Sequence, residues 1–265
     1  VRQTYQHMMK MVVEILRTPR LIHTGGWHQR IQLGNLGPAL KTLNASEPAI
    51  LVTGHVGNWE VLGYLLATLG YRIHAIARPI DNPLVNHWLL DIRERQGMRI
   101  ITKWQASTIM EDVLRGGGTL GIIADQNAGK KGLFVPYFGR LASTYKSIGL
   151  LAISQNVPII CGCAVRVGED YQYRIAVEEI IRPDDWADQP DPLYYVTARY
   201  VRALEKMVRQ TPTQYFWMHR RWRVRPRHER LGRPFPASLQ RKLEELPWMD
   251  EQTLRTVREP ITDPY

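Results

Sequence analysis

The chain has 265 residues, with 35 Lys and Arg against 25 Asp and Glu, and 44% of its residues are hydrophobic. This length can bury a full core, and average hydrophobicity with interspersed charges of both signs excludes a disordered chain. No apolar run approaches the length that spans a bilayer, and no signal peptide is visible. Because the sequence begins with Val1 rather than Met, we expect that an upstream segment, which could include a membrane anchor, is missing.

The two cysteines, Cys161 and Cys163, lie in an apolar stretch with extended-strand character. Both side chains of a C-x-C pair in a strand point to the same face, here toward the core. Two thiols without nearby partners make a poor zinc site, so we interpret them as buried structural thiols in a reduced, cytosolic chain. We expect no metal and no cofactor.

The first predicted element is an amphipathic helix over residues 5–16, whose pattern Pro19 ends. Its apolar side chains can pack in the core, which we favour, or contact a membrane surface. From residue 49 onward, short apolar runs alternate with helical stretches. The predicted strands cover 49–53, 71–77, 98–102 and 119–124, and the predicted helices cover 58–69, 83–96, 106–115 and 145–155. A strand pair over 157–167 and 171–180 and a helix over 193–209 follow.

Strands that alternate with helices of this length predict an α/β fold with a central, mostly parallel sheet flanked by helices. We find no linker that would divide the chain, so we expect one domain over residues 1–265, with an N-terminal helix over 1–20. Residues 231–265 are rich in proline and charge, and we expect this tail to wrap over the surface.

Open α/β sheets place their reactive groups at the carboxyl ends of the strands. The first predicted strand ends in Gly54-His55-Val56-Gly57-Asn58-Trp59-Glu60, where the glycines allow tight turns on either side of His55. A carboxylate that bonds one imidazole nitrogen leaves the other free to take a proton. We therefore predict His55 as a general base oriented by Glu60, although a purely structural pairing of the two is the alternative.

Further polar residues follow the later strands or lie near their ends. The substrate-binding candidates are Asn58, which can also cap the next helix, Arg78, Asp125, Gln126 and Arg166, and Lys103 also follows a strand. Each could form a local salt bridge instead, but residues at neighbouring strand ends can converge on one cleft. The chain has no G-x-S-x-G elbow, no Walker A motif and no G-x-G-x-x-G, which argues against a serine hydrolase and against nucleotide use.

The positive charge is concentrated near the C-terminus. Between Arg220 and Arg233 lie seven arginines and one acid, Glu229, interleaved with tryptophan. This pattern indicates an anionic partner such as phosphate groups, acidic lipid, an acidic carrier protein or nucleic acid, and a solvated surface is the alternative. Arg220 and Arg221 join the substrate-binding candidates.

Four ordered blocks carry a resemblance to a known family. They are TGHVGNWE (53–60), ARPIDNP (77–83), GIIADQNAGKKGLFVPYFGRLAST (121–144) and TPTQYFWMHRRWRVRP (211–226). In this order and spacing they resemble the lysophospholipid acyltransferase superfamily, and within it the bacterial lipid A biosynthesis acyltransferases. The likeness covers about residues 5–230, and the last 30 or so residues match nothing we can place.

The resemblance implies a role for several positions. The family's motif histidine falls on His55 and its acidic partner on Glu60, while Arg78 and Asp125 are expected to line the cleft. The C-terminal HRRW block falls on His219, Arg220, Arg221 and Trp222. Family members act at the cytoplasmic face of the inner membrane, usually with an N-terminal transmembrane helix that is absent from this sequence.

Residues and resemblance together predict transfer of a fatty acyl chain from a thioester to a hydroxyl of a lipid A precursor, without a covalent acyl-enzyme. The co-substrate is an acyl carrier protein or coenzyme A thioester, and the membrane partner is anionic lipid. One alternative keeps the reaction but changes the acceptor to another glycolipid, such as a phosphatidylinositol mannoside, or to a lysophospholipid. A basic nucleic-acid-binding protein is the alternative from a different class, but it leaves the GHVGNWE and DQ blocks unexplained, so we expect no nucleic-acid partner. The sequence does not indicate an oligomeric state.

Overall fold

The structure is a computed structural model of the chain, and it describes residues 1–102 and 106–259. The elements in chain order are α1 (Arg2–Leu21), β1 (Ile31–Leu33), α2 (Gly37–Asn44), β2 (Ala49–Thr53), α3 (Trp59–Thr68), β3 (Ile73–Ala77), α4 (Pro83–Glu94), β4 (Arg99–Thr102), α5 (Ala106–Arg115), β5 (Thr119–Ile123), β6 (Leu133–Tyr137), β7 (Arg140–Thr144), α6 (Ser147–Gln155), β8 (Ile159–Arg166), β9 (Tyr173–Ile181), α7 (Pro192–Gln210), α8 (Arg227–Arg230), α9 (Ala237–Glu244) and α10 (Glu251–Arg258). None of the helices in these two ranges combines the length and hydropathy that crossing a membrane requires.

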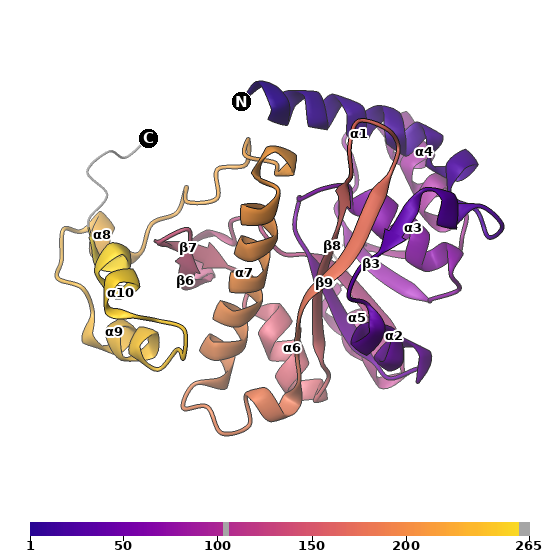
Figure 1. The fold of residues 1–265 in the computed structure, drawn as a ribbon. Coiled ribbons are helices and arrows are strands. Elements are labelled where there is room, and N and C mark those ends of the chain that lie inside the picture. Colours follow the sequence, from indigo (N-terminus) through magenta and orange to yellow (C-terminus); the bar gives the residue numbers. More distant parts are fainter. Residues whose placement is uncertain (103–105, 260–265) are drawn as a thin grey trace.

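A central sheet organises the described part of the chain (Figure 1). Its strand order is β1-β9-β8-β2-β5-β3-β4, and every neighbouring pair is parallel except β8 and β9. The predicted α/β fold with a mostly parallel sheet is therefore confirmed. Because β2, β5, β3, β4 and β8 run in one direction, their carboxyl ends share one edge of the sheet.

The two faces of the sheet are covered by different helices. Along β2, Ile50 and Val52 belong to the large core cluster that includes α5, α6 and α7 side chains, whereas Leu51 packs in small clusters on the other side. This alternation is what a strand requires when both of its faces are buried. Helix α3 contacts β8 and β3, so it covers the face opposite α7.

Most predicted elements are present within a few residues of the expected bounds, and Asn58 caps α3 as expected, by accepting a hydrogen bond from the Val61 N–H. Cys161 and Cys163 are buried free thiols. The antiparallel hairpin β6–β7 lies between the predicted strand over 119–124 and the predicted helix over 145–155, where we predicted no regular element. Strand β1 and helix α2 were also not predicted, since both are short and neither has a clear apolar period.

Helix α1 differs from its prediction in length and in the face it buries. It continues through Pro19 to Leu21, because a proline in the last turn removes only one backbone bond. Its buried residues are mainly polar and include His7, Glu14 and Thr18, while Val12 and Leu16 are 50% and 55% exposed. Met11 is nevertheless buried and Ile15 packs against a core cluster, so the interpretation that its apolar side chains pack in the core is confirmed only for part of them. The helix lies along the edge of the molecule near the β8–β9 hairpin (Figure 1).

The C-terminal tail contributes to the core as well as to the surface. Leu243, Leu246 and Val257, from α9 and α10 and the turn between them, are buried in the main cluster. Trp248 stacks on Tyr195 of α7 with ring centroids 5.6 Å apart. The expectation of a tail that only wraps over the surface is corrected, because these side chains complete the outer side of α7.

This packing predicts that the tail stabilises the whole chain. Leu243→Ala should lower the free energy of unfolding by about 2–5 kcal/mol, the usual cost of deleting a buried leucine. Leu231→Ala, at a position that is 50% exposed, is the control and should change it by less than about 0.5 kcal/mol. Urea unfolding followed by circular dichroism measures both values, and an equal effect of the two variants would contradict the assigned role of the tail.

Candidate active site

The register of β2 and β5 brings two side chains together at the carboxyl edge of the sheet. These strands are parallel neighbours, with Thr53 opposite Ile123. The chain continues for two residues beyond each partner, to His55 after β2 and to Asp125 after β5. The two residues consequently leave the sheet side by side, although they are 70 positions apart in the sequence.

Asp125 holds His55 through both of its carboxylate oxygens. The Nδ1 atom of His55 lies 2.7 Å from Oδ1, and the His55 backbone N–H donates to Oδ2 at 2.8 Å. Burial alone would raise the pKa of Asp125, but the hydrogen bonds from the His55 ring and backbone keep that pKa below its ordinary value. The buried carboxylate stays ionised and fixes the Nδ1–H tautomer.

The remaining ring nitrogen of His55 faces outward. The side chain is 18% exposed, and Nε2 has no hydrogen-bond partner among the described residues. Trp59 contacts the ring edge-on at a centroid distance of 4.7 Å, and Phe216 lies 5.8 Å away. A ring held at Nδ1 by a carboxylate, with Nε2 accessible, is the arrangement that a general base needs to remove a proton from a hydroxyl.

Two glycines permit the close backbone contacts around His55. A Cβ on Gly54 would lie 3.3 Å from Oδ2 of Asp125, so a side chain there would press on the carboxylate. Gly57 has φ of +64°, and a Cβ would lie only 2.0 Å from the Ala164 carbonyl oxygen. The turn after β2 therefore depends on glycine at these positions.

The prediction that Glu60 orients His55 is wrong. Glu60 forms a two-pronged ion pair with Arg93 of α4, at 2.5 and 2.9 Å, and both side chains are largely buried. Helix α3 begins at Trp59, whose indole contacts the His55 ring directly. The Glu60 carboxylate, one residue later, therefore points toward Arg93 of α4. Asp125, which follows the neighbouring strand, lies beside the imidazole where we had expected Glu60.

Two predicted substrate-binding residues have structural roles. Asn58 is fully buried, and its amide both caps α3 and donates to Glu14 and to Tyr173. Arg166 is 8% exposed and is paired with the Glu14 carboxylate. Their polar groups are used within the protein, so we correct both predictions.

The segment after α7 closes another side of the site. The backbone N–H of Asn127 donates to Nε2 of His219 at 2.9 Å, and burial lowers the pKa of His219, which favours the neutral ring. Arg221, predicted to bind substrate, is instead 2% exposed and donates to the Ser143 carbonyl and, at 2.6 Å, to Thr144. It ties this segment to β7, which corrects its predicted role.

The other candidates differ in position. Arg78 is exposed and forms a loose pair with the equally exposed Asp81, at 3.5 Å. Gln126 is half-buried beside Asp125, and Arg220 is exposed next to His219. Their substrate-binding roles stay predictions. Lys103 lies outside the described residues.

An apolar cavity of about 170 Å³ is lined in part by Trp59, the residue that follows Asn58. It lies between the sheet and helices α2 and α3, and its only polar lining residues are Thr53, Glu60 and Arg93. Trp59 lines this cavity and also contacts the His55 ring, so it connects the two. The candidate site thus combines a carboxylate-bound histidine with space for an apolar chain.

Sequence reasoning found His55 and Asp125 separately but missed that they are partners. It also missed Trp59, Phe216 and the contact between His219 and Asn127. The strand-end position of Asp125 was the available signal, but its use requires knowledge that β5, rather than β3, lies beside β2.

The sequence was compared with known proteins. A family model described as bacterial lipid A biosynthesis acyltransferase matches residues 1–224. The chain is 28% identical over 186 residues to the lipid A biosynthesis acyltransferase of Haemophilus influenzae, which covers 69% of this chain and 58% of the relative. It is 25% identical over 153 residues to the lipid A biosynthesis lauroyltransferase of Escherichia coli, covering 57% and 48% of the two chains. The chain thus matches about half the length of these relatives.

The geometry predicts which carboxylate fixes the His55 ring. Asp125→Asn should alter the ¹⁵N resonances of His55 and mix its two neutral tautomers, because an amide does not replace the ionised acceptor. Glu60→Gln should leave these resonances unchanged, since Glu60 is paired with Arg93. The two isosteric variants are compared by NMR at the same pH, and a larger change in Glu60→Gln would contradict the observed pairing.

Proposed function

The chain belongs to the bacterial lipid A biosynthesis acyltransferase family, and on this premise we propose that it transfers a fatty acyl chain from a thioester donor to a hydroxyl of a lipid A precursor. The observation that carries the proposal is the His55–Asp125 pair, which Trp59 connects to an apolar cavity. The family supports acyl transfer in lipid A biosynthesis. The donor, the acceptor hydroxyl and the roles of individual residues are our proposal.

In the proposed reaction, Nε2 of His55 removes the proton from the acceptor hydroxyl. The resulting oxygen attacks the thioester carbonyl, the C–O bond forms and the C–S bond breaks. The proton on His55 then passes to the leaving thiolate, so the base is restored. Asp125 stabilises the imidazolium formed between these steps. No covalent acyl-enzyme is part of this scheme, and His55 contacts both reacting groups in turn.

The apolar cavity is the proposed site for the acyl chain of the donor. Transfer of each buried methylene group from water into such a cavity contributes about 0.8 kcal/mol. Trp59 stands between the His55 ring and the cavity, so a chain in the cavity would place its thioester near Nε2. Glu60 and Arg93 then serve as a neutralised polar pair in the cavity wall.

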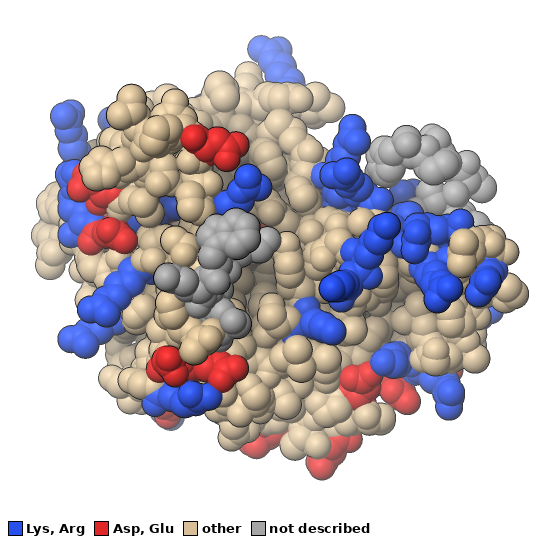
Figure 2. All heavy atoms as spheres, turned by 180° about the vertical axis from the view of Figure 1, so that it is seen from behind, with Lys and Arg blue, Asp and Glu red and all other residues tan. Residues whose placement is uncertain are grey.

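The exposed arginines near the C-terminus support docking of an anionic donor carrier, which we propose is an acyl carrier protein or coenzyme A. Arg220, Arg223, Arg227, Arg230 and Arg233 are all exposed, and Arg220 adjoins His219 at the site. Arg225 is occupied by Glu229 at 2.8 Å. Figure 2 shows Lys and Arg gathered on the side of the molecule that carries α8 and α10 in Figure 1.

The outer face of α1 supports association with an anionic membrane surface. Its exposed apolar residues are Tyr5, Met9, Val12, Val13 and Leu16. The exposed charges on the helix are the cations Arg2, Arg17 and Arg20, while its acid, Glu14, is buried. Apolar side chains flanked by cations match an anionic bilayer surface. We therefore propose a location at the cytoplasmic face of the inner membrane.

The reaction is tested by assay of His55→Ala with paired donors and acceptors. The acyl carrier protein and coenzyme A thioesters are compared as donors. A lipid A precursor, a phosphatidylinositol mannoside and a lysophospholipid are compared as acceptors. Loss of a positioned general base should slow transfer by about 10²- to 10⁴-fold. Near-normal transfer by the folded variant would exclude the role of His55, and preference for another acceptor would correct the proposed substrate.

Membrane association is tested by co-sedimentation with vesicles of phosphatidylglycerol and with vesicles of phosphatidylcholine. Leu16→Gln should weaken binding to the anionic vesicles by about fivefold, the amount expected for a half-buried leucine. Leu150→Gln on α6 is the matched control, since Leu150 is 47% exposed against 55% for Leu16, and should bind as the parent chain does. Equal binding of the two variants would remove α1 from the contact surface.

A further inference from the structure

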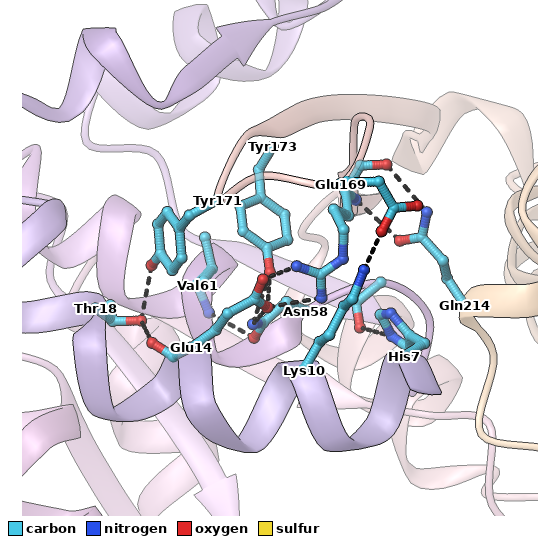
Figure 3. A network of polar contacts seen from close by, with 12 residues as sticks. His7, Lys10, Glu14, Thr18, Asn58, Val61, Glu169, Tyr171, Tyr173 and Gln214 are labelled. Atoms are coloured by element: carbon cyan, nitrogen blue, oxygen red, sulfur yellow. Dashed lines mark hydrogen bonds and ion pairs between the residues drawn. The ribbon is translucent and has the colours of Figure 1, made fainter. Parts of the chain in front are cut away.

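The inner face of α1 carries a buried polar cluster that does not contact the proposed substrates. Glu14, on the fourth turn of the helix, is 7% exposed. Its carboxylate accepts hydrogen bonds from Arg166 at 2.7 Å, from the Tyr173 hydroxyl, and from the Asn58 amide at 3.3 Å. These three partners come from β8, β9 and the N-terminus of α3. Figure 3 shows Tyr173 and Asn58 beside Glu14.

Asn58 connects this cluster to the loop that carries His55, residues 54–58 between β2 and α3. Its Oδ1 must face the Val61 N–H to cap α3, so the amide NH₂ group has to point toward Glu14 and Tyr173. The backbone N–H of Asn58 also donates to the Ala164 carbonyl at 2.8 Å. Asn58, the N-cap of α3, is thus held through every polar group of its side chain. It lies three positions after His55.

A second contact from α1 reaches the same loop. Nε2 of His7 donates to the Gly57 carbonyl at 3.0 Å, and burial lowers the pKa of His7, which favours its neutral ring. Gly57 has a strained conformation for any other residue and is bonded on its other side to the Gln214 carbonyl. Helix α1 consequently forms hydrogen bonds with Gly57 and Asn58, which follow His55 and Val56 in the chain.

We propose that Glu14 is a positioning residue for acyl transfer: through Asn58 it sets the exit of the His55 loop and hence the direction of Nε2. The charge on Glu14 is compensated by Arg166, so the carboxylate can act as a fixed acceptor without a free charge in the interior. Glu14 does not touch the reacting atoms, and its effect on rate passes through Asn58.

The test separates this role from stability. Glu14→Gln alone leaves Arg166 as an uncompensated buried cation, which destabilises the fold. The double variant Glu14→Gln/Arg166→Gln removes both charges together and should recover most of the melting temperature. We expect its kcat to stay at least tenfold below that of the parent chain, with KM for the thioester within twofold. The ¹⁵N resonances of the His55 ring should also shift.

A matched control removes another largely buried ion pair, far from the loop. Glu179 and Arg199 are 2.7 Å apart, with side-chain exposures of 16% and 17%. Glu179→Gln/Arg199→Gln should keep kcat within twofold and leave the His55 resonances unchanged. A similar loss of kcat in both double variants would show a general effect of stability and would overturn the proposal.

Asn58→Ser provides a second test that leaves the Glu14–Arg166 pair intact. Serine still caps the helix but does not reach Glu14, so kcat should fall as in the double variant. Adding Asn58→Ser to the double variant should lower kcat by less than a further twofold, because both changes break the same contact between Glu14 and Asn58. If kcat stays within twofold of the parent in both Asn58→Ser and Glu14→Gln/Arg166→Gln, Glu14 does not position the loop.

The kcat measurement rests on the proposed acyl transfer, whereas the His55 resonances do not. If the parent chain transfers no acyl group but the resonances shift in the variants, the proposed function fails and the positioning role remains. If the parent is active and neither kcat nor the resonances respond, the positioning role fails alone.

Discussion

The parallel register between β2 and β5 is the constraint on which the site depends. With Thr53 opposite Ile123, the chain leaves both strands at the same level, and His55 meets Asp125. A shift of one residue between these strands would turn each side chain to the other face of the sheet. The buried faces of β2 prevent such a shift, because Ile50 and Val52 fit the core on one side and Leu51 fits the α3 side. Packing of ordinary aliphatic side chains thus fixes the geometry of the His55–Asp125 pair.

Helix α1 shows how one element can serve two environments. Its inner face bonds to the start of α3 and to the hairpin strands through Glu14, and its outer face leaves Val12 and Leu16 exposed. In a water-soluble enzyme the opposite arrangement is usual, with apolar side chains inward. Helix α1 therefore connects the proposed lipid contact on its outer face with the loop that carries His55 on its inner face.

The sequence was sufficient for the fold class and for the position of His55 after a strand, because alternation of strands and helices and a histidine at a strand end are local patterns. It was insufficient for the partner of His55. Glu60 is close in sequence, but the start of α3 turns it toward Arg93, and Asp125 becomes a neighbour only through the strand order. Arg166 and Arg221 illustrate a related limit. An arginine at a strand end looks available for substrate until the buried groups that it bonds, Glu14 in one case and Ser143 in the other, are known. The inverted burial of α1 was likewise hidden, since periodicity identifies two faces without saying which one faces inward.

The matched family region ends at residue 224, yet α9 and α10 supply Leu243 and Val257 to the core beside α7. The boundary of the shared sequence is therefore not a boundary of folding. A chimaera that joined residues 1–224 to the tail of a relative would expose the outer side of α7 unless the new tail refilled the same hollow. Exchange of segments between members of this family should accordingly treat α7 and the tail as a single module.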